Sequence, residues 1–343
     1  MKFLVIGLGS IGQRWVRILK ENQEFNVFAY RRLRTTGTIA PDLQSVSNIP
    51  PEVALGITSF STEAELALLK FDVAIICSPI NLHLNDLKLC LDLGISRILI
   101  EKPLSNNISG TEQVFLTKLI DKLKNEKDSP RLVVGFQGRH HPALERIRTY
   151  LQQNAIGQVH YARTEYGEWL PGMHPYEDYQ VSHMSNSKQG GGPASCLSHE
   201  LDLVESIFGK IISSNGYTQK FGVLKTDVPD LVTILWEANS DDFSKVSGES
   251  RMDFVTWPAS RTIEIIGSEG RLLYNWLSGS LIIYSRKKGF IEEDFSNVTR
   301  DDVFKRELEY LLESNKNSKM DIEILDTAVR ISKITSEYSE TYE

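Results

Sequence analysis

The sequence is poor in cysteine, in positive charge and in long apolar runs, and each shortage excludes a class of protein. The three cysteines, Cys77, Cys90 and Cys196, are odd in number and form no CxxC pair, which favours reduced thiols in a cytoplasmic protein. No stretch approaches the roughly 20 apolar residues of a membrane-spanning helix. Lys and Arg number 38 against 45 Asp and Glu, a net charge of -7, so neither a membrane nor nucleic acid is an expected partner.

What remains is an ordinary globular composition, with 41% hydrophobic and 24% charged residues in a chain of 343. At about 150 residues for each domain, this length predicts two domains. The apolar start, Phe3–Ile6, is interpreted as a buried first strand, because the run stops too early for a signal peptide and no small-residue cleavage site follows it.

The first part of the chain alternates short apolar runs with helical patterns, which predicts βαβ units and a parallel, doubly wound sheet. Between its second and third strands, residues 35–51 lack periodicity and are expected to form a loop. A capping box at Thr62 and Glu65 predicts a short helix that ends near residue 70. The predicted strands are 3–6, 26–30, 72–77, 97–100 and 131–135, and further helices are expected after residue 10, over 81–93 and from about 117.

Beyond residue 131 the pattern changes to that of an α+β domain with a large, mainly antiparallel open sheet. A polar, aromatic and glycine-rich stretch covers residues 165–192. The last helix, about 321–341, is expected to pack back on the body. We therefore predict two domains, 1–130 and 131–343. In the second, the predicted elements are a helix over 142–152 and strands over 157–164, 230–237, 261–266, 270–276 and 280–285.

A glycine motif directly follows the first predicted strand. Residues 7–12 read Gly-Leu-Gly-Ser-Ile-Gly, which fits GxGxxG between a strand and a helix. The glycines let the backbone approach a diphosphate, whose charge is met by unpaired N–H groups and by the positive end of the helix dipole. The chain is thus predicted to bind a dinucleotide, through Gly7, Gly9, Ser10, Ile11 and Gly12.

The end of the second predicted strand indicates which dinucleotide binds. NAD enzymes usually place a carboxylate about 20 residues after the last glycine, where it accepts hydrogen bonds from the ribose hydroxyls. This chain has Arg31 and Arg32 there instead. A guanidinium pairs with the extra phosphate of NADP, so we predict NADP as the preferred cofactor, with NAD as the alternative.

Further motifs give the chain a family resemblance. A Ser-Pro turn followed four residues later by histidine begins the crossover at residues 78–83, and Glu-Lys-Pro follows at 101–103, at the end of a predicted parallel strand. With GxGxxG, this order resembles the Gfo/Idh/MocA oxidoreductases, the family of glucose-fructose oxidoreductase and inositol dehydrogenase. Similar blocks occur at 135–139, 156–157, 190–202 and 267–270. Further cofactor contacts that the resemblance implies are Ser78, Pro79, His83, Glu101 and Lys102.

The resemblance implies hydride transfer between nicotinamide and a sugar or polyol carbon. Lys102 corresponds to the family lysine that holds the reacting hydroxyl and polarises the carbonyl, and His199 corresponds to the catalytic histidine. An unperturbed lysine, with a pKa near 10.4, is a poor proton acceptor at pH 7, whereas histidine titrates near 6.5. Ser195 stands where many members carry Asp. It supplies no negative charge, so the proton path and the physiological direction stay open.

The stretch of residues 166–179 interleaves aromatic rings with carboxylates, which suits a sugar, because C–H faces stack on rings and hydroxyls pair with carboxylates. A similar segment occurs in family members associated with bacterial surface-polysaccharide pathways. His174, His183 and His199 fit no zinc-binding spacing, so no metal is expected. The residues predicted to bind a small sugar substrate are Arg139, Glu168, Trp169, His174, Tyr179, Ser195 and Asp202.

Two other functions remain open on the sequence alone. One is a non-catalytic, cofactor-sensing regulator or scaffold on the same fold, as in a yeast galactose regulator of this family. The other is a reductase of a non-sugar carbonyl or imine, as in the family's biliverdin-type members. In each case the resemblance implies a homodimer or homotetramer formed through the sheet of the second domain.

Overall fold

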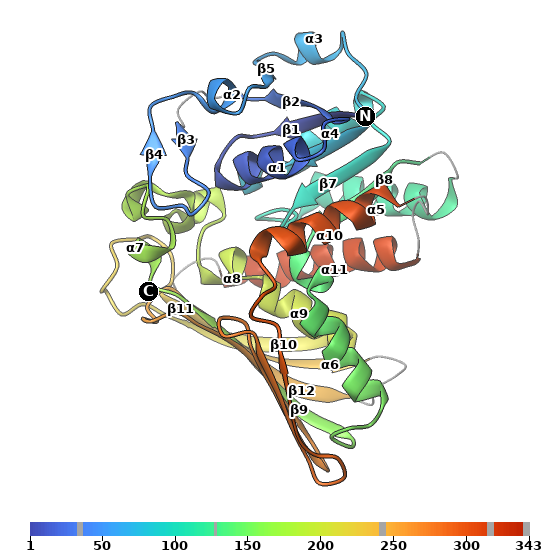
Figure 1. Cartoon of the computed structure of the whole chain (residues 1–343), viewed down its shortest axis with the longest axis vertical. Coiled ribbons are helices and arrows are strands. Elements are labelled where there is room, and N and C mark those ends of the chain that lie inside the picture. The colour runs from blue at the N-terminus through green and yellow to red at the C-terminus, as the bar shows by residue number, and fades with distance from the viewer. Residues whose placement is uncertain (33–36, 127–128, 240–244, 314–318, 339–343) are drawn as a thin grey trace. The chain divides into compact units, whose positions relative to one another are not determined.

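The computed structural model describes residues 1–32, 37–126, 129–239, 245–313 and 319–338 (Figure 1). The described residues form two compact units, and the chain passes between them several times. The first unit contains the described parts of Met1–Gly135, His174–His183 and Glu307–Lys333. The second contains those of Phe136–Met173, Met184–Arg306 and Ile334–Glu343.

The first unit is built on a six-stranded sheet in which every neighbouring pair is parallel. Its order is β5-β2-β1-β6-β7-β8. The strands are β1 (Lys2–Ile6), β2 (Asn26–Tyr30), β5 (Thr58–Phe60), β6 (Val73–Ile76), β7 (Arg97–Glu101) and β8 (Arg131–Gly135). The helices are α1 (Ser10–Lys20), α2 (Pro51–Ala54), α3 (Glu63–Leu66), α4 (His83–Asp92) and α5 (Gly110–Asn125), with a 3-10 turn, η1, at Ile80–Leu82.

This sheet contains a topological switch point. The chain goes from β1 outward to β2 and β5, then returns so that β6 lies on the other side of β1. Every residue of β6 and β8 is buried, as expected for strands covered on both faces. In open parallel sheets, ligands bind outside the carboxyl ends of the strands at such a point. The predicted site therefore lies where β1 and β6 end.

Two C-terminal helices, α10 (Arg300–Leu312) and α11 (Lys319–Ser336), are attached to the first sheet through Arg131. This arginine begins β8, and its side chain is only 1% exposed. Its guanidinium donates to the carbonyl oxygens of Leu311 and Glu313, pairs with Asp321 at 3.2 Å, and lies over the ring of Tyr310. These contacts bring residues far apart in the sequence into one core.

The second unit is built on an eight-stranded sheet in the order β10-β11-β12-β9-β13-β14-β15-β16. All neighbours are antiparallel except β9 and β12, which are parallel. Helices α9 (His199–Phe208) and α6 (Pro142–Gln152) lie along one face of this sheet (Figure 1). The strands are β9 (Val159–Gly167), β10 (Lys210–Gln219), β11 (Leu231–Asn239), β12 (Val246–Asp253), β13 (Ser260–Gly267), β14 (Gly270–Asn275), β15 (Ser280–Ser285) and β16 (Gly289–Asp294).

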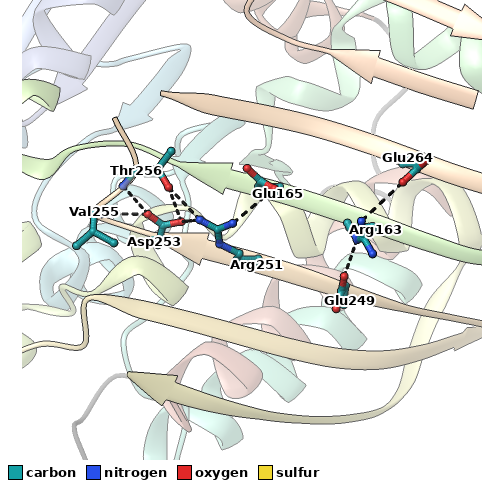
Figure 2. Close-up of polar contacts among 8 residues, drawn as sticks. All are labelled: Arg163, Glu165, Glu249, Arg251, Asp253, Val255, Thr256 and Glu264. Carbon is teal, nitrogen blue, oxygen red and sulfur yellow. Dashed lines mark hydrogen bonds and ion pairs between the residues drawn. The ribbon is translucent and has the colours of Figure 1, made fainter. Parts of the chain in front are cut away.

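The side chains that β9, β12 and β13 direct away from the core form rows of alternating charge, shown in Figure 2. Arg163 lies between Glu249, at 2.5 Å, and Glu264, at 3.9 Å. Arg251 lies 2.7 Å from Asp253 and 3.8 Å from Glu165. The register explains these pairs, because Arg163 is opposite Glu249 on one neighbouring strand and opposite Glu264 on the other. We call this set the outer charge rows.

The predicted fold class is confirmed, a parallel Rossmann sheet followed by a large, mainly antiparallel sheet. Four elements have the predicted bounds: the strands 26–30, 131–135 and 280–285 and the helix 142–152. The capping box of Thr62 and Glu65 is also present. Strand β8 belongs to the first sheet, so a domain boundary at residue 130 separates it from its neighbour β7.

Other expectations differ from the structure. The predicted loop 35–51 contains a two-stranded hairpin, β3 (Thr38–Ile39) with β4 (Val46–Ser47), and its residues 35 and 36 lie outside the described residues. Helix α11 ends at Ser336, before the predicted end at 341, and residues 339–341 are likewise not described. The sequence patterns missed β10, β12, β16 and α10, because these elements alternate polar and small residues or carry many charges.

Within the described ranges no helix has both the length and the apolar character needed to cross a lipid bilayer. All three cysteines are free thiols. Cys77 and Cys90 lie in the first unit, and burial raises the pKa of both thiols well above the usual value. These two side chains are therefore inert, neutral packing groups.

Candidate active site

The glycine motif forms a cradle at the carboxyl end of β1. Gly7 has a φ of +90°, and a Cβ there would meet the Cys77 carbonyl oxygen at 2.7 Å. A Cβ on Gly12 would meet the Gly7 carbonyl oxygen at 2.0 Å. Both positions require glycine to bring the strand, the turn and the helix close together.

Gly9 differs from these two glycines. Its backbone is extended, with φ -71° and ψ -166°, a conformation that any residue adopts. A Cβ on Gly9 would meet nothing within 4 Å among the described atoms. The fold therefore leaves open space at this position, and space is what a diphosphate needs to reach the backbone.

Helix α1 begins directly after Gly9 and has no side-chain cap. Its first turn, Ser10 to Gly12, presents backbone N–H groups at the positive end of the helix dipole. No acidic side chain lies in this first turn. Open space, free donors and positive potential together fit the diphosphate of a dinucleotide.

The Glu-Lys-Pro motif follows β7, two strands from β1 in the same sheet. Glu101 is nearly buried, and its carboxylate accepts a hydrogen bond of 3.3 Å from the Trp15 indole. Lys102 is half-buried. Because the carboxyl ends of parallel strands share one edge, Lys102 lies along the same edge as the glycine cradle.

His83 connects the two turns that flank this edge. Its Nδ1 is 2.9 Å from the Pro103 carbonyl oxygen and its Nε2 is 2.8 Å from that of Ser78. Burial lowers the pKa of His83, although the two carbonyl oxygens act in the opposite direction. The histidine that the sequence assigned to the cofactor is thus held between the turn at Ser78 and the turn at Pro103, the residue that follows Lys102.

The segment 174–183 belongs to the first unit, although its neighbours in the chain belong to the second. Burial raises the pKa of Tyr176 to about 12, and the side chain of Ser10, in the glycine motif, acts in the opposite direction. His183 interacts electrostatically with Lys102 and with His83. Of the residues predicted to bind sugar, His174 and Tyr179 therefore lie in the cofactor unit, whereas Glu168 and Trp169 lie in the other.

The two arginines after β2 have different surroundings. The Arg31 side chain is 3% exposed and pairs with Glu52 at 2.5 Å. Arg32 is one-third exposed, lies over the Tyr30 ring, and pairs with Asp86 at 2.6 Å and with Glu63 at 3.6 Å. A ligand at the end of β2 would reach Arg32 more readily than the buried Arg31.

In the second unit, His199 is the first residue of α9, and its ring is half-buried and edge-on to Phe136. One turn further along, Asp202 pairs with Arg139 at 2.6 Å, and both side chains are more than 90% buried. Burial raises the pKa of Asp202, and the Arg139 guanidinium offsets part of this effect. Arg139 and Asp202, both predicted to bind the substrate, thus form an ion pair with each other.

Around the start of α9 the side chains are closely packed. Ser195 is buried, with 3% exposure. Glu200 is fully buried and pairs at 2.8 Å with Arg261, whose guanidinium lies over the rings of Tyr166 and Trp276. The Tyr166 hydroxyl donates to Glu168 at 3.3 Å. Sequence patterns gave no signal for Arg261, because its partners come from other parts of the chain.

Lys102 lies in the first unit and His199 in the second, each with the surroundings described above. Among the described residues, no group of three or more His, Cys, Asp or Glu side chains could hold a metal ion.

Comparison with known proteins gives matches over most of the chain. Residues 1–125 match the model "Oxidoreductase family, NAD-binding Rossmann fold", and residues 144–273 match "GFO/IDH/MocA C-terminal domain". A trans-1,2-dihydrobenzene-1,2-diol dehydrogenase from Xenopus tropicalis is 32% identical over 110 residues. That match spans 32% of this chain and 28% of the relative, so it covers under one-third of the relative's length.

Several solved structures share the fold. An oxidoreductase domain protein from Kribbella flavida is 17% identical, with a TM-score of 0.72 over 99% of both chains. A levoglucosan dehydrogenase in complex with NADH and L-sorbose is 16% identical, with a TM-score of 0.69 over 98% of this chain and 97% of that one. A UDP-N-acetylglucosamine 3-dehydrogenase from Acidithiobacillus ferrooxidans is 18% identical, with a TM-score of 0.67 over 98% of each.

Proposed function

The chain belongs to the GFO/IDH/MocA oxidoreductase family, and we propose that it transfers a hydride between a nicotinamide cofactor and a carbinol or carbonyl carbon of a sugar or sugar derivative. The observation that carries the proposal is the open space at Gly9 in a cradle whose other two glycines are closed by contacts within the protein. Lys102 follows a strand of the same sheet, at the edge where a dinucleotide in that cradle would extend.

The nicotinamide, when bound, accepts or supplies the hydride. Lys102 donates a hydrogen bond from its ammonium to the reacting oxygen, which orients the carbon and stabilises negative charge that develops there. His199 takes up or returns the hydroxyl proton, because histidine changes charge near neutral pH. Ser195, where many relatives carry Asp, offers a hydrogen bond without charge.

For the cofactor, we propose NADP in preference to NAD, with Arg32 as the partner of the 2′-phosphate. The one-third exposure of the Arg32 side chain supports this role. Arg31 is less suited to it, because its side chain is buried against Glu52. Asp86 and Glu63 beside Arg32 are the feature that favours NAD, because carboxylates repel the extra phosphate. The ratio of the dissociation constants of NADPH and NADH measures the preference, and a tighter complex with NADH contradicts it.

The proposed substrate is a sugar, with or without a linked nucleotide. Relatives of the same fold act on levoglucosan and on UDP-N-acetylglucosamine. Glu168 and Trp169 supply a carboxylate and an aromatic face in the second unit, and His174 and Tyr179 supply polar groups and rings in the first. The other proposed substrate residues, Arg139, Ser195 and Asp202, belong with His199 to the second unit.

We also propose that the protein works in the cytoplasm as a homodimer or homotetramer. Three free cysteines support the compartment. The outer charge rows support the assembly, because a face with alternating charges can match a second copy of itself through a two-fold axis. The mass in solution tests this assembly, and a monomer at micromolar concentration contradicts it.

The direct test of the function combines titration of NADP(H) and NAD(H) with turnover on sugars and nucleotide-linked sugars. We expect Lys102→Ala to lower kcat by about 100-fold or more while cofactor affinity changes little. Lys118→Ala, an exposed position on α5, is the matched control and should keep full activity. A wild-type protein that binds neither cofactor, or a Lys102→Ala variant with full turnover, contradicts the proposal. Cofactor binding without any turnover favours the regulator.

A further inference from the structure

The charge of Arg32 is shared with a carboxylate that lies inside the first unit. Asp86 belongs to the first turn of helix α4, and its side chain has an exposure of 0%. Its Oδ1 lies 2.6 Å from a guanidinium nitrogen of Arg32. The sequence pattern indicated Arg32 but not Asp86, because this partner comes from a different element of the fold.

Backbone hydrogen bonds place Arg32 beside the glycine cradle. The Gly7 N–H donates to the Tyr30 carbonyl oxygen at 3.0 Å, which joins the cradle to the last residue of β2. The Arg31 N–H donates to the Phe60 carbonyl oxygen, also at 3.0 Å. Arg32 follows directly, at the carboxyl end of the sheet. In a fold of this kind, the ribose of the adenosine half lies at the end of the second strand.

The crossover that carries Asp86 is attached to the same edge. The Cys77 N–H, just after β6, donates to the Ile6 carbonyl oxygen at 2.8 Å. His83, the first residue of α4, lies with its Nε2 2.8 Å from the Ser78 carbonyl oxygen. Asp86 follows in the same turn of the helix. The fold therefore fixes the position of this carboxylate, and its burial means that the protein must compensate its charge.

The two members of the pair differ in exposure. The Arg32 side chain is 33% exposed and lies over the Tyr30 ring, 4.8 Å from the ring centroid, whereas Asp86 is inside. A guanidinium has five N–H donors in a fixed fork, so it can hold a carboxylate and still offer donors to a ligand. Asp86 thus anchors Arg32 and, at the same time, offsets part of its positive charge.

We propose that Asp86 is a selectivity-determining residue of the cofactor site and acts through Arg32. This inference rests on the proposed function, because it requires that the cradle binds a dinucleotide. The 2′-phosphate of NADP accepts from the remaining donors of Arg32 but is repelled by the carboxylate behind them. The neutral ribose hydroxyls of NAD are not repelled in this way. The protein therefore uses both cofactors, with dissociation constants within about tenfold of each other.

The test is Asp86→Asn, whose amide oxygen still accepts from Arg32 but carries no charge. Titration calorimetry measures the binding of NADPH and NADH, and of adenosine 2′,5′-bisphosphate and AMP, which differ only in the 2′-phosphate. Removal of a unit charge near the phosphate, in partly buried surroundings, should strengthen NADPH and bisphosphate binding by about tenfold. The affinities for NADH and AMP should change by less than about twofold.

Glu63→Gln is the matched control. Glu63 lies 3.6 Å from the same guanidinium, but its side chain is 60% exposed. Water and salt screen an exposed charge, so at about 0.15 M salt this variant should change the affinity for NADPH by less than about twofold. An effect as large as that of Asp86→Asn would mean that the buried position of Asp86 is not what sets the selectivity, and would overturn the proposal.

Arg32→Ala tests the pair from its other side. This variant leaves Asp86 buried without its ion-pair partner, so its thermal midpoint should fall, and adding Asp86→Asn should restore most of the loss. An unchanged or smaller preference for NADPH in Asp86→Asn, or a wild-type midpoint in Arg32→Ala, overturns the proposal while the proposed function stands. A wild-type protein that binds neither cofactor contradicts the proposed function itself.

Discussion

At the scale of single residues, His141 is a buried histidine whose neutral form holds the start of a helix. Its Nδ1 accepts a hydrogen bond of 3.2 Å from the Ala143 N–H, so it caps helix α6. Its ring lies among the aromatic side chains of Tyr274, Trp276 and Phe295. Protonation of Nδ1 would remove the acceptor and place a charge among these rings.

This arrangement predicts a loss of stability in mild acid. Burial, with the charges of Arg261 and Arg306, lowers the pKa of His141 to about 4. The unfolded chain takes up the proton near pH 6.5, before the folded one does, so the contribution is complete above about 6.5 and is lost as the pH falls toward 4. Its full size is on the order of 3 kcal/mol.

The variant His141→Asn keeps an acceptor at the cap but does not titrate. We expect the thermal midpoint of this variant to fall less steeply than that of the wild type between pH 7 and pH 5, as measured by circular dichroism. If the thermal midpoints of the two proteins fall equally steeply with pH, the pKa of His141 is the same in the folded and the unfolded state.

The residues of the site could be predicted from the sequence only where a local pattern carries them. Gly7, Gly9 and Gly12 are set by a turn between neighbouring elements, so their spacing is sufficient. The ion pair between Arg261 and Glu200 joins distant parts of the chain, and no periodicity indicates it. Arg31 and Arg32 looked equivalent in sequence, but an ion pair with Glu52 holds one of them inside.

At the scale of elements, Arg131 joins strand β8 to the C-terminal helices, and its removal should loosen both. With the guanidinium gone, Asp321 would lose its ion-pair partner in the core, and the carbonyl oxygens of Leu311 and Glu313 would lose a donor. We expect Arg131→Ala to destabilise the protein by about 3–5 kcal/mol.

The control is Lys122→Ala on helix α5, where the lysine is 53% exposed and pairs with Glu126 at 3.7 Å. Exposed pairs contribute about 0–1 kcal/mol, so its unfolding midpoint should stay close to that of the wild type. Chemical unfolding of both variants measures the difference. A similar loss of stability in the two variants would mean that Arg131 contributes no more to the free energy of unfolding than a surface ion pair does.

Elements were predictable where apolar residues dominate a short segment. Strands β2, β8 and β15 and helix α6 have dense apolar patterns, and their predicted bounds hold. Strand β10 is polar, and β12 has serine, glycine and charged residues at many positions. These strands exist because neighbours in the sheet pair with their backbones, which is information that their own residues do not contain.

At the scale of the whole molecule, the chain returns twice to its first unit after the second has begun. Residues 174–183 and most of the C-terminal helices are contributed by segments far along the sequence. Two domains and a final helix that packs back on the body were predicted from the sequence. The return of residues 174–183 to the first unit was not, because it depends on distant parts of the chain. The consequence is that the first unit is built from three separate parts of the chain.

The central claim is that the glycine cradle is shaped for a dinucleotide, and Gly9 tests it most directly. Alanine at Gly9 meets no protein atom within 4 Å and has a permitted backbone conformation, so the fold should tolerate it. The measurement is the dissociation constant of NADPH and NADH for Gly9→Ala by titration calorimetry, with its thermal midpoint beside it. The account predicts an unchanged midpoint and a loss of binding of about 100-fold or more, because the methyl group occupies the space of the diphosphate. Wild-type affinity in this variant would contradict it.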